Sequence, residues 1–139
     1  MSWLEYHDEP VTLHSGGQSH WLVRGDLIFA DVRLRETVLD YWEYEIAAHR
    51  RPYFFWAIPT GGSCWAEAIS ERVRAHWNNR PGPANIRNGA TIFTVDDVLT
   101  TGGSLVGCKR PLVVVDQNQR EHQLERVTAW ATMYLPVLG

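Results

Sequence analysis

Two adjacent carboxylates, Asp96 and Asp97, are followed within seven residues by two glycines and three hydroxyl side chains. Glycines let backbone N–H groups close around an anion, and hydroxyls add further hydrogen-bond donors. The stretch that follows, Leu105–Lys109, is expected to form a short helix whose N-terminus would also favour an anion. The spacing therefore predicts that Asp96–Ser104 is a loop that binds a phosphate group.

The two carboxylates point to a second part of the ligand, because like charges repel and carboxylates do not bind phosphate. They suit the neighbouring hydroxyls of a sugar, or a hydrated Mg²⁺ ion. A ligand with a phosphate at one end and a diol close by is a ribose 5-phosphate. The alternative is an ordinary strand-to-helix turn capped by Ser and Thr, but capping does not require two carboxylates. The glycine patterns of P-loops and of dinucleotide-binding domains are both absent.

The elements that must position this loop alternate along the chain. Buried strands are expected where short apolar runs are continuous, and helices where apolar residues recur every three or four positions. The expected strands are Val11–Ser15, His20–Arg24, Leu27–Ala30, Tyr53–Ile58, Thr91–Val95, Leu112–Val115 and Val127–Leu135. The expected helices run from the cap Asp31 to about His49, from the cap Ser63 to about Trp77, and over Leu105–Lys109.

This order predicts a single α/β domain over residues 1–139, with a mostly parallel sheet flanked by helices. The first two strands are separated by Gly16-Gly17-Gln18 and predict a short N-terminal β hairpin. Asn78–Ala90 reads as a polar connection. Ligands of such sheets sit beyond the carboxyl ends of the strands. The loops Pro59–Gly62 and Asp96–Ser104 both follow strands, so we expect them to share one crevice.

Composition narrows the class of protein. The 139 residues contain no run near the roughly 18 apolar residues of a membrane span, and the acidic stretch Met1–Pro10 does not resemble a secretory signal. Cys64 and Cys108 form no disulfide framework, which favours reduced thiols in a cytoplasmic protein. The net charge of −3 argues against a broad nucleic-acid-binding surface.

The chain contains seven tryptophans, which is a large number for its length. One interpretation places them in the core and in a subunit interface, where tryptophan is enriched. The other lets one of them stack on a base. The first interpretation, together with the small size of the domain, predicts a homodimer.

The sequence I-F-T-V-D-D-V-L-T-T-G-G-S over Ile92–Ser104 closely resembles the motif that binds 5-phosphoribosyl 1-pyrophosphate (PRPP) in type I phosphoribosyltransferases. The orotate phosphoribosyltransferases are the most similar subgroup. Three further segments resemble parts of that family in the expected order, namely Leu13–Ser19, Ala57–Gly62 and Val113–Asp116. The resemblance implies a transferase that uses PRPP and Mg²⁺, in which a nitrogenous base displaces pyrophosphate at ribose C1.

The resemblance also implies roles for individual residues. Asp96 and Asp97 would be the catalytic residues that hold the ribose hydroxyls, and they would contact Mg²⁺ through water or through those hydroxyls. Thr60, Gly61 and Gly62 would face the pyrophosphate. The implied PRPP-binding residues are Asp96, Asp97, Val98, Leu99, Thr100, Thr101, Gly102, Gly103 and Ser104.

Positive charge is missing where the orotate enzymes carry it. Those enzymes have a mobile loop rich in lysine and arginine, but the corresponding interval Asn78–Ala90 contains no lysine. Thr60 stands in place of the lysine of the pyrophosphate loop, and His14 in place of a basic residue before the Ser-Gly segment. Gln117 stands where an arginine would help to hold the carboxylate of orotate. The one lysine of the chain is Lys109.

Three hypotheses about function remain open, because a fold does not determine a function. The first is a compact phosphoribosyltransferase that acts on an unidentified base, with arginines such as Arg24, Arg74, Arg80 or Arg87 replacing the lysines. The second is a weak or inactive homologue that binds PRPP or a nucleotide as a regulatory or assembly protein. The third, an RNA-binding regulator, conflicts with the acidic balance of the chain.

Overall fold

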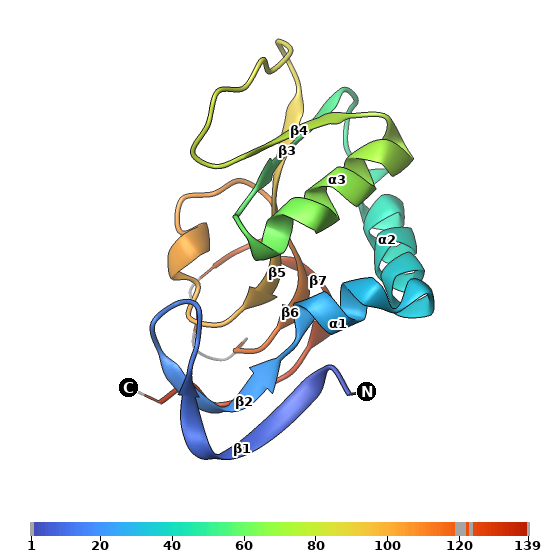
Figure 1. The fold of residues 1–139 in the computed structure, drawn as a ribbon. Helices are drawn as coiled ribbons and strands as arrows, with labels where there is room; N and C mark the ends of the chain where they lie inside the picture. The colour runs from blue at the N-terminus through green and yellow to red at the C-terminus, as the bar shows by residue number, and fades with distance from the viewer. Residues whose placement is uncertain (1, 119–121, 123, 139) are drawn as a thin grey trace.

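The computed structural model describes residues 2–118, 122 and 124–138. Its main sheet is built from β3 (Tyr53–Ala57), β4 (His76–Asn79), β5 (Thr91–Leu99), β6 (Pro111–Asp116) and β7 (Thr128–Thr132). The strands lie in the order β4-β3-β5-β6-β7, and every neighbouring pair is parallel (Figure 1). The predicted α/β fold with a mostly parallel sheet is therefore confirmed.

The N-terminal segment forms the predicted hairpin from β1 (Leu4–Thr12) and β2 (Gln18–Val23). The first strand begins well before the predicted run, and its register shifts between Tyr6 and Val11. Near the other end of the chain, Leu138 forms an antiparallel bridge with Gln18. The hairpin lies at the end of the sheet where β5 and β6 finish, as Figure 1 shows.

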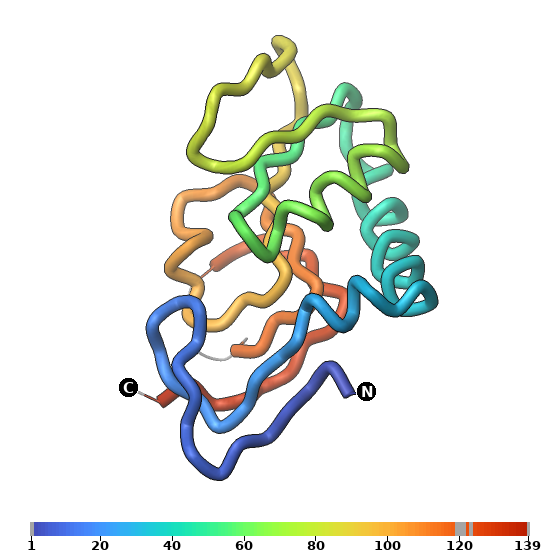
Figure 2. Tube along the Cα trace, viewed as in Figure 1, coloured from blue at the N-terminus to red at the C-terminus, as the bar shows by residue number. Residues whose placement is uncertain are grey.

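Three helices cover one face of the sheet: α1 (Gly25–Ala30), α2 (Val32–Ile46) and α3 (Gly61–Val73) (Figure 2). Asp31 caps α2 as predicted, since its Oδ1 accepts hydrogen bonds from the N–H groups of Arg33 and Leu34 at 3.0 and 3.1 Å. No helix in the described part of the chain is long and apolar enough to cross a membrane.

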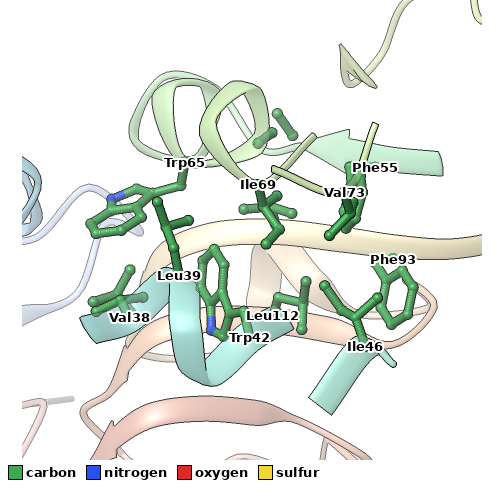
Figure 3. Packing of buried hydrophobic residues seen from close by; sticks show 14 of the residues in the cluster. Val38, Leu39, Trp42, Ile46, Phe55, Trp65, Ile69, Val73, Phe93 and Leu112 are labelled. Carbon is green, nitrogen blue, oxygen red and sulfur yellow. The ribbon is translucent and has the colours of Figure 1, made fainter. Parts of the chain in front are cut away.

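Aromatic side chains fill the core between the helices and the sheet. Trp42 of α2 and Trp65 of α3 are fully buried and meet edge to face, with ring centroids 5.7 Å apart (Figure 3). Phe29 packs against the other side of Trp65 at 4.9 Å. None of the seven tryptophans is exposed. A second, smaller cluster built on Leu99, Leu105 and Val113 fills the space beneath the predicted phosphate loop.

Two predictions around the helices were wrong. Leu27–Ala30 is not a strand but part of α1, because a run this short does not distinguish strand from helix and its packing beside Trp65 decides. The predicted cap Ser63 lies inside α3, which begins at Gly61, and its hydroxyl donates to Asn79 Oδ1 at 2.5 Å. That helix ends at Val73, before the predicted Trp77, because the next residue, Arg74, adopts a left-handed φ of 55°.

The polar residues after α3 also differ from the prediction. His76–Asn79 forms the edge strand β4, which was expected to be helix and connection. This strand pairs only with β3 and is not fully buried, so it lacks the apolar pattern of the inner strands.

The predicted loop Asp96–Ser104 is a loop only in its second half. Strand β5 continues to Leu99, so the two carboxylates belong to the strand. The predicted helix Leu105–Lys109 is absent, and a single 3-10 turn, η1 (Gly103–Leu105), stands in its place. Gly107 adopts a φ of +75° two residues later, which prevents the chain from continuing as a helix. The expected contribution of a helix dipole is therefore wrong.

Candidate binding site

A cavity of about 250 Å³ opens at the carboxyl ends of β3 and β5. Four segments of the chain line it: the hairpin, the loop after β3, the segment from the end of β5 to η1, and the residue after β6. The two glycine-containing loops therefore share one crevice, as predicted. The lining residues are Leu13, His14, Ser15, Leu22, Val23, Ile58, Pro59, Thr60, Gly61, Asp96, Asp97, Val98, Leu99, Thr100, Thr101, Gly102, Gly103, Ser104, Leu105 and Gln117.

Asp96 and Asp97, the acidic pair, lie half-buried at the end of β5. The N–H of Asp97 donates to Asp96 Oδ1 at 2.8 Å, and the N–H of Val98 donates to Asp97 Oδ1 at 2.7 Å. Burial, with the neighbouring charge of Asp97 as a second cause, raises the pKa of Asp96 to about 8. Carboxyl groups held in this way can hydrogen-bond a sugar hydroxyl, and in their ionised form they can contact a cation.

Two glycines make room for the carboxylate of Asp97. A Cβ atom at Gly61, in the first turn of α3, would lie 2.5 Å from the carboxyl atoms. A Cβ atom at Gly25, at the start of α1, would lie 2.6 Å from Oδ2. Any larger residue at either position would displace the carboxylate. Sequence reasoning missed Gly25, whose only signal is its place directly after the hairpin.

Thr100–Ser104, the part of the predicted phosphate loop that follows β5, offers donors from its backbone. Gly102 adopts a φ of +87°, a conformation that favours glycine. Within the described part of the chain, the N–H groups of Thr101 and Gly102 have no hydrogen-bond partner. Thr100 Oγ1 donates to Ser15 Oγ at 2.9 Å, which joins the loop to the hairpin. A turn with free N–H groups around a glycine is a favourable anion site even without a helix behind it.

A buried pair of side chains supports the back of this loop. His122 Nδ1 accepts from the N–H of Leu124 at 3.2 Å, so its Nε2 carries the proton and donates to Asp116 at 2.7 Å. Both side chains of the pair are almost fully buried. His122 and Leu124 lie directly beside Gly102, where a Cβ atom would be 3.3 Å from the Cβ of His122. His122 and Leu124 therefore support the conformation of the phosphate loop at Gly102.

The predicted pyrophosphate segment is only partly at the cavity. Thr60 and Gly61 line it, whereas Gly62 does not. Gly62 instead packs against the backbone of β5 at Val95, and its N–H donates to the carbonyl of Ile58 at 2.8 Å. Because Gly62 has no side chain, it allows α3 to approach the sheet closely.

Among the residues that the structure describes, no lysine or arginine lines the cavity. Arg24 is held by Glu5 at 3.2 Å and Asp26 at 2.8 Å on the surface, and Arg80 donates to Cys108 Sγ at 2.9 Å. Lys109 is exposed. None of the four arginines considered as replacements for the missing lysines, Arg24, Arg74, Arg80 and Arg87, lines the cavity.

The donor set fits Mg²⁺ only when a ligand supplies most of the oxygens. Among the described residues there is no group of three or more His, Cys, Asp or Glu side chains that could hold a metal ion. Mg²⁺ is commonly held by one or two carboxylates together with substrate phosphates and water. Asp96 and Asp97 are the carboxylates that line the cavity and could serve in this way.

Other lining residues were not predicted as site residues, including the apolar side chains Leu22 and Val23 of β2. None of the tryptophans lines the cavity, so no tryptophan stands ready to stack on a ligand there. Gln117 does line it and is fully buried, and its side-chain oxygen has no hydrogen-bond partner among the described residues.

Comparison with known proteins gives similarity in structure but not in sequence, because no family model and no curated protein matches. The orotate phosphoribosyltransferase of Aeropyrum pernix aligns with a TM-score of 0.67 and 21% identity, over 94% of this chain and 88% of that chain. The UMP synthase of Leishmania donovani aligns with a TM-score of 0.68 and 15% identity, over 94% of this chain and 33% of that one.

A third solved structure is that of adenine phosphoribosyltransferase from Trypanosoma brucei, in complex with AMP, pyrophosphate and ribose-5-phosphate. It aligns with a TM-score of 0.63 and 11% identity, over 95% of this chain and 76% of that chain. Both orotate and adenine enzymes are therefore similar in fold across most of the chain. This chain has the fold of the type I phosphoribosyltransferases.

Proposed function

We propose that this protein is a phosphoribosyltransferase that binds PRPP in the cavity and transfers its phosphoribosyl group to a nitrogenous base, releasing pyrophosphate. The observation that carries the proposal is that the acidic pair and the free N–H groups of the phosphate loop line the same cavity in this fold. The acidic pair suits ribose hydroxyls, and the free N–H groups suit a 5-phosphate. The two cysteines, Cys64 and Cys108, are both free, which fits a protein of a reducing compartment such as the cytoplasm.

In this proposal the protein acts mainly by positioning. The phosphate loop holds one end of PRPP and the acidic pair holds the ribose, so that C1 lies in a fixed direction from the incoming base. Thr60 and the first turn of α3 face the departing pyrophosphate. Asp96 and Asp97 would help to hold Mg²⁺, which would supply positive charge near the departing pyrophosphate. Protonation of Asp96 near neutral pH lowers the repulsion between the acidic pair and an anionic ligand.

A second candidate is a weak or inactive homologue that binds PRPP or a nucleotide in a regulatory or assembly role. One observation favours it, namely that no lysine or arginine lines the cavity among residues 2–118, 122 and 124–138. Charge-assisted hydrogen bonds contribute about 1.5–3 kcal/mol each, so the loss of several would slow the departure of pyrophosphate by orders of magnitude.

The test is calorimetric titration with PRPP and Mg²⁺, comparing the wild-type protein with the double variant Asp96→Asn/Asp97→Asn. We expect the double variant to keep its fold and to lose binding by about a hundredfold or more, because both carboxyl groups proposed to contact the ribose hydroxyls are removed. Equal affinity of the two proteins would show that the acidic pair does not bind the ribose.

A screen for pyrophosphate release over free bases then separates the two candidates. Release with any base supports the transferase. PRPP binding without release under any base supports the inactive homologue. The double variant serves as the negative control for release in both cases.

A further inference from the structure

Gln117, directly after β6, is a buried amide with unused hydrogen-bonding capacity. Its side chain is fully buried and lines the cavity. Nε2 makes one long hydrogen bond, 3.4 Å to the carbonyl of Leu135, and Oε1 has no partner among the described residues. Buried polar groups without partners are rare, and one at the wall of a cavity is explained by a ligand that completes it.

The side chain of Gln117 is not what holds its strand in place. Its backbone N–H donates to the carbonyl of Leu99 at 2.9 Å, and its carbonyl accepts from the N–H of Leu135 at 2.8 Å. These backbone bonds tie β5, β6 and the segment after β7 together whatever the side chain is. The amide is therefore available for recognition.

The other residues that line the cavity indicate which kind of ligand fits it. Leu13, Leu22 and Val23 form an apolar part of the lining that comes from the hairpin and its end. The acidic side chains in the described part of the lining are Asp96 and Asp97, and this part contains no lysine or arginine. An apolar wall suits the face of a flat, uncharged ring, whereas a ligand with an added carboxylate would meet the acidic pair with no lysine or arginine among the described lining residues to offset it.

We propose that Gln117 determines which base the protein accepts, and that the base is uncharged and presents an N–H group to Oε1. This inference rests on the proposed function and specifies its substrate class. The second hydrogen of Nε2 remains free to donate to a carbonyl or ring nitrogen beside that N–H. Such an adjacent donor and acceptor is the edge that an amide side chain pairs with in two hydrogen bonds, as Asn and Gln do with adenine. The carboxylate of orotate offers only acceptors, so it would leave Oε1 unpaired wherever it faced Gln117.

The experiment compares nucleoside monophosphates with ribose 5-phosphate, which lacks the base. Calorimetry would give the affinity of AMP, IMP, UMP and orotidine 5′-monophosphate relative to ribose 5-phosphate, which isolates the contribution of the base. We expect at least one of the three uncharged bases to bind about tenfold or more tightly than ribose 5-phosphate, because a paired amide is gained. We expect orotidine 5′-monophosphate to bind no more tightly than ribose 5-phosphate.

The variants are Gln117→Leu, which removes both amide groups at similar volume, and Gln117→Glu, which keeps an acceptor. With Gln117→Leu the advantage of the preferred nucleotide should fall about tenfold while the affinity for ribose 5-phosphate stays unchanged. If Gln117→Leu does not fold, loss of the donor in Gln117→Glu should still change the order of preference among the three nucleotides. Asn118→Leu is the matched control, because Asn118 is also buried with a partner-free side-chain oxygen but does not line the cavity.

The possible results test the role of Gln117, the substrate class and the proposed function separately. An unchanged advantage in Gln117→Leu, or an unchanged order of preference in Gln117→Glu, would overturn the role of Gln117. Tighter binding of orotidine 5′-monophosphate than of the uncharged nucleotides would overturn the substrate class. Failure of ribose 5-phosphate itself to bind would overturn the proposed function, and the inference with it.

Discussion

Raising the pH should destabilise the ligand-free protein through Asp96. In the folded protein the pKa of Asp96 is raised from 3.8 to about 8, first by burial and then by the charge of Asp97. Between these two values the folded protein keeps a proton that the unfolded chain has lost. The stability contributed by this proton is therefore complete below about pH 4 and falls steadily until about pH 8.

The size of the effect follows from the shift. One pKa unit corresponds to about 1.4 kcal/mol, so the whole shift sets an upper limit of about 6 kcal/mol. Asp96 is only half-buried, and solvent screening reduces the effect. We expect a loss of about 2–3 kcal/mol between pH 5 and pH 8.5, which for a domain of this size lowers Tm by roughly 6–12 °C.

The assay is thermal unfolding of the wild-type protein and of Asp96→Asn at several pH values across this range. The amide cannot ionise, so the difference between the two proteins reports on Asp96 while other titrating groups cancel. We expect similar Tm values at pH 5 and a more stable Asp96→Asn variant at pH 8.5. Asp97→Asn removes the second cause of the shift and should reduce the pH dependence. A difference that stays constant from pH 5 to pH 8.5 would mean that Asp96 is already ionised at pH 5.

Three further predictions test the site and the assembly. Gly61→Ala should weaken PRPP binding by about tenfold or more, as measured by calorimetry, because a Cβ atom 2.5 Å from the carboxyl group of Asp97 would displace it; unchanged affinity would contradict this. The protein should be a homodimer by light scattering at tens of micromolar, since Val32 and Tyr44 are 60% and 78% exposed on α2, and a monomeric mass would refute it. Orotate should turn over more slowly than about 1 per second with PRPP and Mg²⁺, and faster loss of orotate absorbance would show that arginines have replaced the missing lysines.

The inner strands could be predicted because burial on both faces leaves a clear pattern in the sequence. The runs at Tyr53–Ala57 and Pro111–Asp116 are almost continuously apolar and form β3 and β6 as expected. The edge strand His76–Asn79 has no such pattern, because it has only one neighbour and polar side chains. The missing helix after Ser104 was expected from the position of the loop, but Gly107 and its φ of +75° follow too closely.

The sequence predicted the site residues whose side-chain type suits ligand binding. It did not predict residues such as Gly25, which matter only because they leave space for a neighbouring side chain. The acidic pair and the glycines of the phosphate loop differ in type from an ordinary turn, so the sequence alone marks them. Gly25 is far from Asp97 in sequence, and its closeness to that carboxylate depends on how α1 packs near the start of α3. Gln117 could be predicted as a replacement for arginine, but its unused oxygen is a property of the packed structure.

The charges in the cavity affect ligand binding and catalytic turnover differently. Two aspartate side chains and, within the described residues, no lysine or arginine line a cavity proposed to hold an anionic substrate. In this proposal binding depends on the free N–H groups of the phosphate loop, on a neutral Asp96 and on Mg²⁺ carried by the ligand. These groups are in place before any reaction begins. Charge on the departing pyrophosphate develops only in the transition state, where a fixed cation would act most strongly. The arrangement therefore favours ribose 5-phosphate binding over rapid catalysis, and the comparison of PRPP affinity with the rate of pyrophosphate release measures the two separately.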